Sequence, residues 1–220
     1  MPLSLSKASQ FVKIVSLLKP LLSWYQPSYV CGPPTSLPLK FHDFLRLALD
    51  LNDKEIKQAW SDLGNDAWAQ EMPAVEELSA RTKYMAVFLQ HGLSRDIGVF
   101  SLEPLSRTCI DSACAQQLCA DPSQLRDKEL VEPLTVKITV YTKEFGSVPR
   151  FSTSRYCRHC HTRYHPNYYV HSDATLQTYY RDNLRYLQIS GHCYVDINLC
   201  ELFSIMMVTS CVPPPHQITL

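Results

Sequence analysis

The sequence predicts an α+β protein that has helices in its first half and a small antiparallel β module followed by a helix in its second half. Apolar residues recur at helical spacing through the first hundred positions, whereas apolar and polar residues alternate after position 134. Two pairs of cysteines flank the alternating segment. We therefore expect a helical unit at residues 1–104, a β module at 105–211 and a tail at 212–220.

The first predicted helix is marked by apolar residues at helical spacing, namely Phe11, Ile14, Val15, Leu18 and Leu22. Pro20 falls inside this run and is expected to stop or kink the helix, because proline lacks a backbone donor. The run is too short to span a bilayer, and Lys13 and Lys19 interrupt it, so we expect no membrane partner. Residues 26–39 contain four prolines and are predicted to form a linker.

Three further helices are expected before the pattern changes. The first runs from Phe41 to Leu49. The second begins at Asn52 or Asp53, either of which can cap it, and ends before Gly64. The third begins at Pro73 and ends at His91-Gly92, since proline suits a first helical turn and glycine suits the residue after a helix.

The β module begins with a strand over residues 135–141, where Val136, Ile138 and Val140 alternate with polar residues. Gly146 and Pro149 indicate a turn, and residues 151–156 are expected to return antiparallel to the first strand. The closing helix carries apolar residues at positions 199, 202, 203, 206 and 207. We expect this stripe to pack back on the module.

Four cysteines carry the most specific chemistry in the chain. Cys157 and Cys160 form a CxxC turn directly after the returning strand, and Cys109 and Cys114 form a CxxxxC pair before the first strand. Together they supply the four thiolates of a closed tetrahedral zinc site. The strand pair would bring one cysteine pair to the other, as in a zinc ribbon. The sequence therefore predicts a zinc-ribbon-like module with Zn²⁺ as its cofactor.

Other interpretations of these cysteines remain open at this point. The 42 residues between Cys114 and Cys157 exceed the roughly 15–20 of a compact four-cysteine motif. Cys119 forms a second CxxxxC with Cys114, and a nearby histidine could replace one ligand (His159, His161 or His165). The cysteines could also be buried free thiols. No secretory signal is evident, which indicates a reducing compartment and favours metal over disulfides.

An enzyme is not expected. A two-metal nuclease or transposase site needs carboxylates spread over a mixed sheet, and Asp173, Asp182, Asp196 and Glu201 lie too close together in sequence. Asp196 is better explained as a surface or capping residue. The other reading is a thiol-redox CxxC, but such a motif usually opens a helix, whereas Pro166 and its aromatic neighbours predict strand and loop. No small-molecule substrate is indicated.

Charge is distributed unevenly, although the formal net charge is zero. Residues 40–104 contain eleven acids against seven Lys and Arg, and residues 150–192 contain six arginines against two acids. Arginines neutralise phosphates and tyrosines stack on unpaired bases, so DNA is the leading partner. The candidate nucleic-acid-binding residues are Arg155, Arg158, Arg163, Tyr164, Tyr168, Arg181 and Arg185. The alternative is a structural zinc-folded module that binds another protein.

The same residues carry a family resemblance. The chain resembles the fungal zinc-chelating cysteine-cluster family associated with KDZ transposases, over most of its length and most clearly at Thr108-Cys109, Cys114, residues 156–171, Tyr179-Tyr180 and residues 188–207. The resemblance implies Cys109, Cys114, Cys157 and Cys160 as ligands, a transposase or DNA as partner, and the nucleus as location. Members of that family are expected to continue beyond the last helix, so the end after Cys211 suggests a truncated copy.

Overall fold

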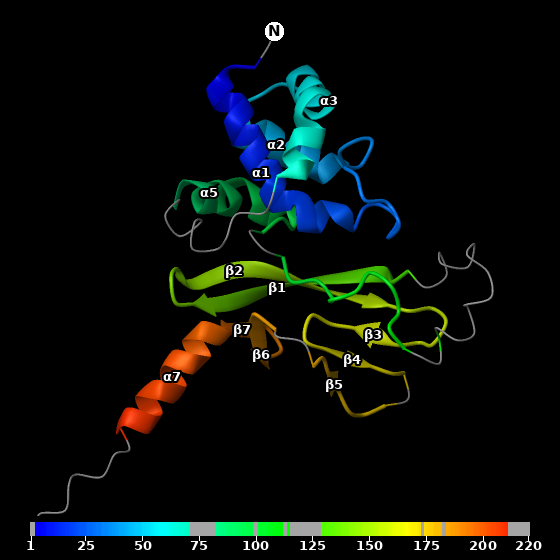
Figure 1. Cartoon of the computed structure of the whole chain (residues 1–220), viewed down its shortest axis with the longest axis vertical. Helices are drawn as coiled ribbons and strands as arrows, with labels where there is room; N and C mark the ends of the chain where they lie inside the picture. Colours follow the sequence, from blue (N-terminus) through cyan, green and yellow to red (C-terminus); the bar gives the residue numbers. More distant parts are fainter. Residues whose placement is uncertain are drawn as a thin grey trace, which may run out of the picture.

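The computed structural model describes residues 3–70, 82–98, 101–111, 114, 129–172, 174–181 and 184–210. Helices α1, α2, α3 and α5 lie on one side of a seven-stranded sheet, and helix α7 leaves the other side (Figure 1). The predicted α+β class, with N-terminal helices, a sheet and a C-terminal helix, is confirmed. The helices and the cysteines have separate apolar cores.

Helix α1 (Leu5–Ser23) begins at Ser4, whose side chain accepts a hydrogen bond from the backbone of Lys7. The helix continues through Pro20, so of the two expected effects, a stop or a kink, the stop is wrong. Proline costs a helix at least one hydrogen bond. Here the leucines on both sides of Pro20 are buried (Leu17, Leu18, Leu21 and Leu22), and their burial keeps the last turn helical.

Helices α2 (Leu39–Leu49) and α3 (Asp53–Ala69) pack on α1. The predicted cap of α3 is confirmed: Asn52 and Glu55 form a reciprocal capping box. The prediction that α3 ends before Gly64 is wrong, because the helix runs on to Ala69. Gly64 lies inside α3 against the ring of Trp60, and the buried Trp68 donates from its indole to the Cys31 carbonyl beyond it.

Helix α5 (Thr82–Val87) passes into a π-helical turn at Phe88–Gly92 and a 3₁₀ turn at Leu93–Arg95. The predicted start of this helix at Pro73 lies outside the described residues. The left-handed residue that follows the helical turns is Asp96, not glycine. Gly92 has a φ of −89°, which residues other than glycine also adopt. A glycine is needed there because its Cα lies against the backbone of Ile97 and leaves no room for a side chain.

We expect Gly92→Ala to lower the free energy of unfolding by about 1–3 kcal/mol, the usual cost of overpacking. An added Cβ would collide with the carbonyl oxygen of Ile97, which is rigid backbone, and would also approach Phe44. Gly64→Ala is the matched control, since its Cβ would meet Trp60 at an ordinary 3.4 Å inside a helix that prefers alanine. Urea unfolding of both variants tests this. Equal midpoints for the two would contradict the packing argument.

The sheet has the order β5-β4-β3-β2-β1-β7-β6. The long hairpin of β1 and β2 matches the predicted antiparallel pair, with Gly146 in the left-handed region at the turn. The sheet as a whole is mixed, because β7 pairs with β1 in parallel while the other pairs are antiparallel. The strands are β1 (Val131–Thr142), β2 (Gly146–Tyr156), β3 (Arg163–Tyr164), β4 (Tyr168–Val170), β5 (Thr178–Tyr179), β6 (Tyr186–Ser190) and β7 (Cys193–Asp196).

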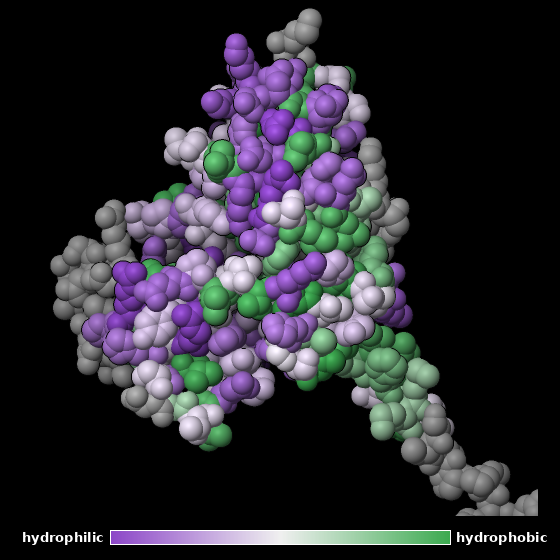
Figure 2. All heavy atoms as spheres, turned by 180° about the vertical axis from the view of Figure 1, so that it is seen from behind, coloured by the Kyte–Doolittle hydropathy of each residue, from purple (hydrophilic) through white to green (hydrophobic). Residues whose placement is uncertain are grey.

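Helix α7 (Ile197–Ser210) follows β7 directly, and the Asp196 carboxylate accepts a hydrogen bond from the backbone of Asn198 at 2.9 Å. The helix points away from the sheet (Figure 1), and its surface is strongly hydrophobic (Figure 2). Met207 is 70% exposed and Phe203 is 55% exposed, so the expectation that α7 packs back is wrong. The apolar residues of α7 are distributed over all sides of the helix, so its sequence does not mark one face for burial.

Two arginines join the helical unit to the sheet, and we name Arg107 and Arg155 the arginine clamp. Arg107 donates to the carbonyl oxygens of Ser23, the last residue of α1, and of Pro27 beyond it. The guanidinium of Arg155 lies 4.1 Å from the ring centroid of Trp24. Both contacts reach the C-terminal end of α1, so this end is one of the points at which the helical unit is held to the sheet.

Candidate metal centre

The second cysteine pair lies in a tight turn at the end of β2. Cys157 follows the last residue of the strand, and its backbone N–H donates to the carbonyl of Thr162 at 2.9 Å, which closes the turn. His161 completes the reversal in the left-handed region with a φ of 56°. Because Cys157 and Cys160 lie in one tight turn, their sulfur atoms point to the same side of it.

The first cysteine pair reaches the same place from a segment that lies beside the sheet. Thr108 forms an isolated antiparallel bridge with Glu129, and the N–H of Leu130 donates to the carbonyl of Arg107 at 2.9 Å. This pairing places Cys109 at the open end of the β1–β2 hairpin, away from its turn. Cys114 follows and is buried, while residues 112–113 and 115–128 lie outside the described part.

The four sulfur atoms form one compact group, all within 4.8 Å of one another. Cys109 and Cys160 are 3.5 Å apart and Cys114 and Cys157 are 3.9 Å apart between sulfurs. A tetrahedron with zinc–sulfur bonds of about 2.3 Å requires sulfur separations of about 3.8 Å. The observed separations fit this geometry and are far longer than the roughly 2.05 Å of a disulfide. The group can therefore hold a metal ion.

All four cysteines predicted as ligands are thus brought together by the fold. The group contains none of the three histidines considered as replacements. His161 instead accepts or donates a 2.6 Å hydrogen bond with the hydroxyl of Tyr156. Cys119 lies outside the described residues. Within the described ranges, this is also the single cluster of three or more potential metal ligands.

Burial dominates the electrostatics of the group. It raises the pKa of Cys109 to about 11 and raises the pKa of Cys114 further, since a buried thiolate loses hydration and repels its neighbours. Burial also opposes ionisation of Cys157, but the backbone amides of Cys160 and His159 donate to its sulfur and lower its pKa overall. Four thiolates in this space need a compensating cation, which a divalent metal would supply.

An apolar and aromatic shell covers the cysteines. Leu130 and Tyr164 are buried against them, and Tyr169 and Tyr180 pack around the same cluster. The rings of Tyr164 and Tyr169 lie 5.6 Å apart, and those of Tyr169 and Tyr180 lie 5.9 Å apart. The shell keeps water from the sulfurs, and such a shell controls solvent access to a metal site.

Two hydroxyl groups contact the sulfurs, and sequence reasoning did not assign them this position. The hydroxyl of Tyr164 lies 3.1 Å from the sulfur of Cys109, and the hydroxyl of Thr162 lies 3.2 Å from the sulfur of Cys160. Tyr164 was expected to stack on nucleic acid. The signal that could have found both is their spacing of two in the segment that leads from Cys160 into β3, since an extended chain places residues 162 and 164 on one face.

The candidate nucleic-acid residues divide into buried and exposed ones. Arg155, Tyr164 and Tyr168 are buried. Arg155 is ion-paired with Glu103 at 3.2 Å, and each of these two side chains is 10% exposed. Tyr168 stacks on His165 with ring centroids 4.5 Å apart. These three side chains therefore contribute to the buried packing of the sheet and of the metal group.

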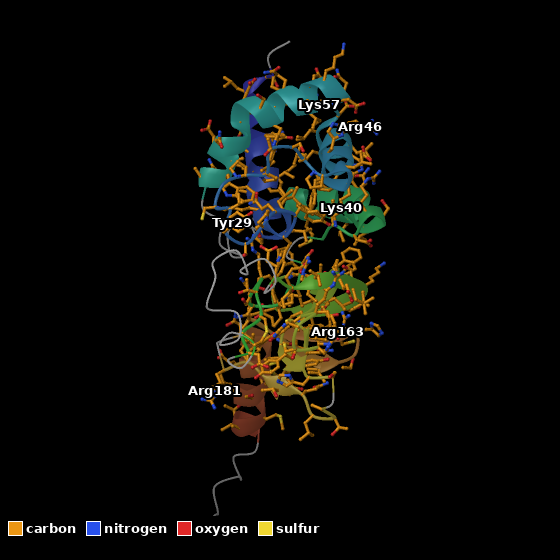
Figure 3. The ribbon with its side chains drawn as sticks, turned by 90° about the vertical axis from the view of Figure 1, so that its right-hand side faces the viewer. Tyr29, Lys40, Arg46, Lys57, Arg163 and Arg181 are labelled. Atoms are coloured by element: carbon orange, nitrogen blue, oxygen red, sulfur yellow. The ribbon has the colours of Figure 1, made fainter. Side chains whose placement is uncertain are left out.

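The other four arginines reach the surface without forming one patch. Arg158 is exposed and ion-paired with Glu132 at 3.0 Å, and Arg185 lies 3.7 Å from Asp196. Arg163 donates to Ser154 and lies over the ring of Tyr156. Figure 3 places Arg163 and Arg181 on opposite sides of the sheet half. The fold therefore brings together the cysteines but separates these arginines.

The acids considered for catalysis have other positions. Asp196 caps α7, which is one of the two roles expected of it, but it is buried and not at the surface. Glu201 is exposed on α7, while Asp173 and Asp182 lie outside the described residues. None of the helices in the described ranges has the length and hydropathy that crossing a bilayer requires.

Comparison with known proteins points to one family. No curated protein and no solved structure matches the chain. The family described as CxC5-like cysteine cluster associated with KDZ transposases matches residues 97–214, which is more than half of the 220-residue chain and includes all four clustered cysteines. The chain therefore belongs to the CxC5-like cysteine-cluster family associated with KDZ transposases.

Proposed function

We propose that the chain is a zinc-binding recognition module of a transposase system, without catalytic activity of its own. The observation that supports it is the compact group of four sulfurs, contributed by Cys109, Cys114, Cys157 and Cys160. A closed set of four thiolates suits Zn²⁺, which prefers tetrahedral sulfur coordination. Bound zinc would supply positive charge and a crosslink between the two cysteine pairs, and no open position for catalysis.

Zinc content per purified chain tests the proposal directly. We expect one zinc per chain by elemental analysis, and none in Cys157→Ser or Cys160→Ser. Cys31→Ser is the matched control, because Cys31 is exposed and lies outside the group, and it should keep the metal. A folded wild-type chain without zinc would refute the proposal and leave the cysteines as buried thiols.

We also propose that this zinc module docks on a helical unit that corresponds to residues 1–104. The module extends slightly before position 105, since Leu102 exchanges backbone hydrogen bonds with Phe151 and Thr153 on β2. The family match likewise begins at residue 97. Limited proteolysis of the zinc-loaded chain should yield a stable fragment that begins between residues 97 and 105.

DNA is the partner that the exposed arginines favour (Arg158, Arg163, Arg181 and Arg185), and such binding would take place in the nucleus. Affinity for a short DNA duplex should fall with salt, with a log–log slope of about −0.9 per phosphate neutralised. Because Arg163 and Arg181 lie on opposite sides of the sheet half (Figure 3), one duplex should contact only part of this set. Fluorescence anisotropy at several salt concentrations measures this slope. Arg163→Ala should reduce its magnitude by about one, whereas Lys57→Ala on α3 should leave it unchanged.

The exposed apolar surface of α7 favours a second candidate function, recognition of a protein such as the associated transposase. Phe203, Ile205, Met207 and Val208 are all more than half exposed. Binding through them would depend little on salt, because apolar burial involves no counterion release. A salt-insensitive complex that Met207→Glu abolishes would favour a protein partner over DNA.

A further inference from the structure

We infer that Tyr164 and Thr162 are positioning residues of the metal centre, whose hydroxyl groups donate hydrogen bonds to the thiolates of Cys109 and Cys160. This inference rests on the proposed zinc site. It assigns strand β3 a role that neither the family match nor the cysteine spacing provides. The role follows from three features of the structure: the charge of the centre, the alternation of residues 162–164 and a chain of contacts beyond Thr162.

The charge of the centre creates the need for donors. Four thiolates and one divalent cation leave a net charge of −2 in a group of which three cysteines are buried and Cys160 is partly buried. Buried charge is costly unless it accepts hydrogen bonds, and bonds to a charged acceptor are stronger than neutral ones. The amides of His159 and Cys160 serve Cys157. Cys109 accepts one such bond from the backbone amide of Asp111. Both Cys109 and Cys160 gain from a further donor, because hydrogen bonds to a charged acceptor are strong.

The extended segment of residues 162–164, which leads into β3, supplies those donors through its alternation. Thr162 and Tyr164 point to the same face because successive residues of an extended chain point to opposite faces. Both are buried, with relative exposures of 0% and 1%, and their hydroxyls lie 3.2 Å and 3.1 Å from the two sulfurs. Arg163, between them, points away to Ser154 and to the ring of Tyr156.

The direction of each hydrogen bond follows from the chemistry of a thiolate. A thiolate has no proton and can only accept, so the hydroxyl of Tyr164 must donate to Cys109. In this structure the Cys160 thiol donates to the Thr162 oxygen, and the Thr162 hydroxyl donates to the Cys160 carbonyl at 3.5 Å. A Cys160 thiolate has no proton to donate, so on metal binding the Thr162 hydroxyl turns to donate to the sulfur, and its oxygen is then free to accept. The Nδ1 atom of His171 lies 2.7 Å from this oxygen and can donate to it.

The contact chain continues to the first cysteine pair. The same Nδ1 atom of His171 lies 3.9 Å from a carboxylate oxygen of Asp111, two residues after Cys109. Thr162, His171 and Asp111 therefore form a second connection, besides the sulfur atoms, between the turn that contains Cys160 and the segment that contains Cys109. Ligand-orienting residues of this kind typically change metal affinity or activity by 10–100-fold when they are replaced.

The test uses the full chain loaded with Co²⁺ or Zn²⁺. We expect Tyr164→Phe to release zinc to a chelator at least tenfold faster than wild type, and Thr162→Val to do the same, while Thr162→Ser retains the slow rate. In the cobalt form, loss of a donor makes the thiolate a stronger electron donor. The thiolate-to-cobalt absorption bands of Tyr164→Phe and Thr162→Val should therefore shift to longer wavelength.

Tyr180→Phe is the matched control. Its ring packs in the same cluster, but its hydroxyl donates to the His165 carbonyl at 3.0 Å and not to a sulfur. It should keep the wild-type cobalt spectrum and zinc release rate. A folded Tyr164→Phe that also keeps both would overturn the inference. A wild-type chain that binds neither ion would instead refute the zinc site itself, so the two failures are distinguishable.

Discussion

Removal of zinc by a chelator is expected to unfold the sheet half of the chain and to produce a larger loss of stability than any single substitution. Zinc binding to four-ligand sites of this kind contributes about 10–16 kcal/mol of apparent free energy, and binding and folding are coupled. The cysteine cluster has a small apolar core, with Leu130 and Tyr164 as its buried members besides cysteines. Without the metal, repulsion and desolvation of the thiolates oppose this packing.

Circular dichroism during a chelator titration measures this effect. The β-sheet signal should disappear, while much of the helical signal remains, because the helical unit has its own core around Phe11, Phe41 and Phe44. Zinc added back should restore the sheet and Mg²⁺ should not, since magnesium prefers oxygen ligands. An unchanged sheet signal in demonstrably zinc-free protein would contradict the prediction.

Acid should act in the same direction as the chelator. Zinc binds thiolates and so releases thiol protons, and burial raises the pKa of Cys109 to about 11. Protons therefore compete with the metal more strongly as the pH falls. Zinc affinity should decrease continuously from neutral to acidic pH, which equilibrium dialysis with zinc analysis can measure.

The second large effect is expected at the buried ion pair between Glu103 and Arg155. Arg155→Met should lower the free energy of unfolding by about 3–5 kcal/mol, because it leaves the Glu103 carboxylate buried without its partner. Each side chain is 10% exposed, so little solvent screening reduces this cost. The substitution also removes the contact of Arg155 with the ring of Trp24. Urea unfolding with zinc present measures the loss.

A double variant separates the lost charge pair from lost packing. Glu103→Leu combined with Arg155→Met replaces the pair by apolar side chains, and such replacements are often neutral or stabilising. The double variant should therefore be more stable than Arg155→Met alone. If both are destabilised equally, the cost lies in packing and not in the unpaired carboxylate.

The pH dependence of Arg155→Met has a definite sign. Burial raises the pKa of Glu103 above its ordinary value, and Arg155 partly opposes this. A raised carboxyl pKa costs the folded state nothing below the ordinary value and costs most above the folded one. Loss of Arg155 raises the pKa further. The destabilisation should therefore be greatest near neutral pH and smaller at mildly acidic pH, with zinc content verified at each.

Local chemistry made part of this structure predictable. Asn52 caps α3 as expected because a capping box is complete within four residues. The β1–β2 hairpin follows from alternation and from Gly146, and both patterns are local. The four cysteines could be grouped in advance because tetrahedral coordination sets both their number and their type.

Features that depend on distant neighbours were not predictable in the same way. Whether α1 survives Pro20 depends on leucines that are buried by other helices. The parallel pairing of β7 depends on which edge of β1 remains open after β2 has formed. Tyr164 illustrates the same limit, since an aromatic residue beside arginines suits base stacking equally well until its hydroxyl is placed near Cys109.

The arginine clamp has a thermodynamic consequence. Arg107 stands two residues before Cys109, and Arg155 stands two residues before Cys157, so each cysteine pair shares a short backbone segment with one contact to the end of α1. Linkage between two binding equilibria is reciprocal. If a bound ion stabilises the contacts of the helices by a given free energy, those contacts strengthen the binding of the ion by the same free energy. A metal ion held by the four cysteines would therefore owe part of its affinity to the contacts that the two arginines make with the end of α1.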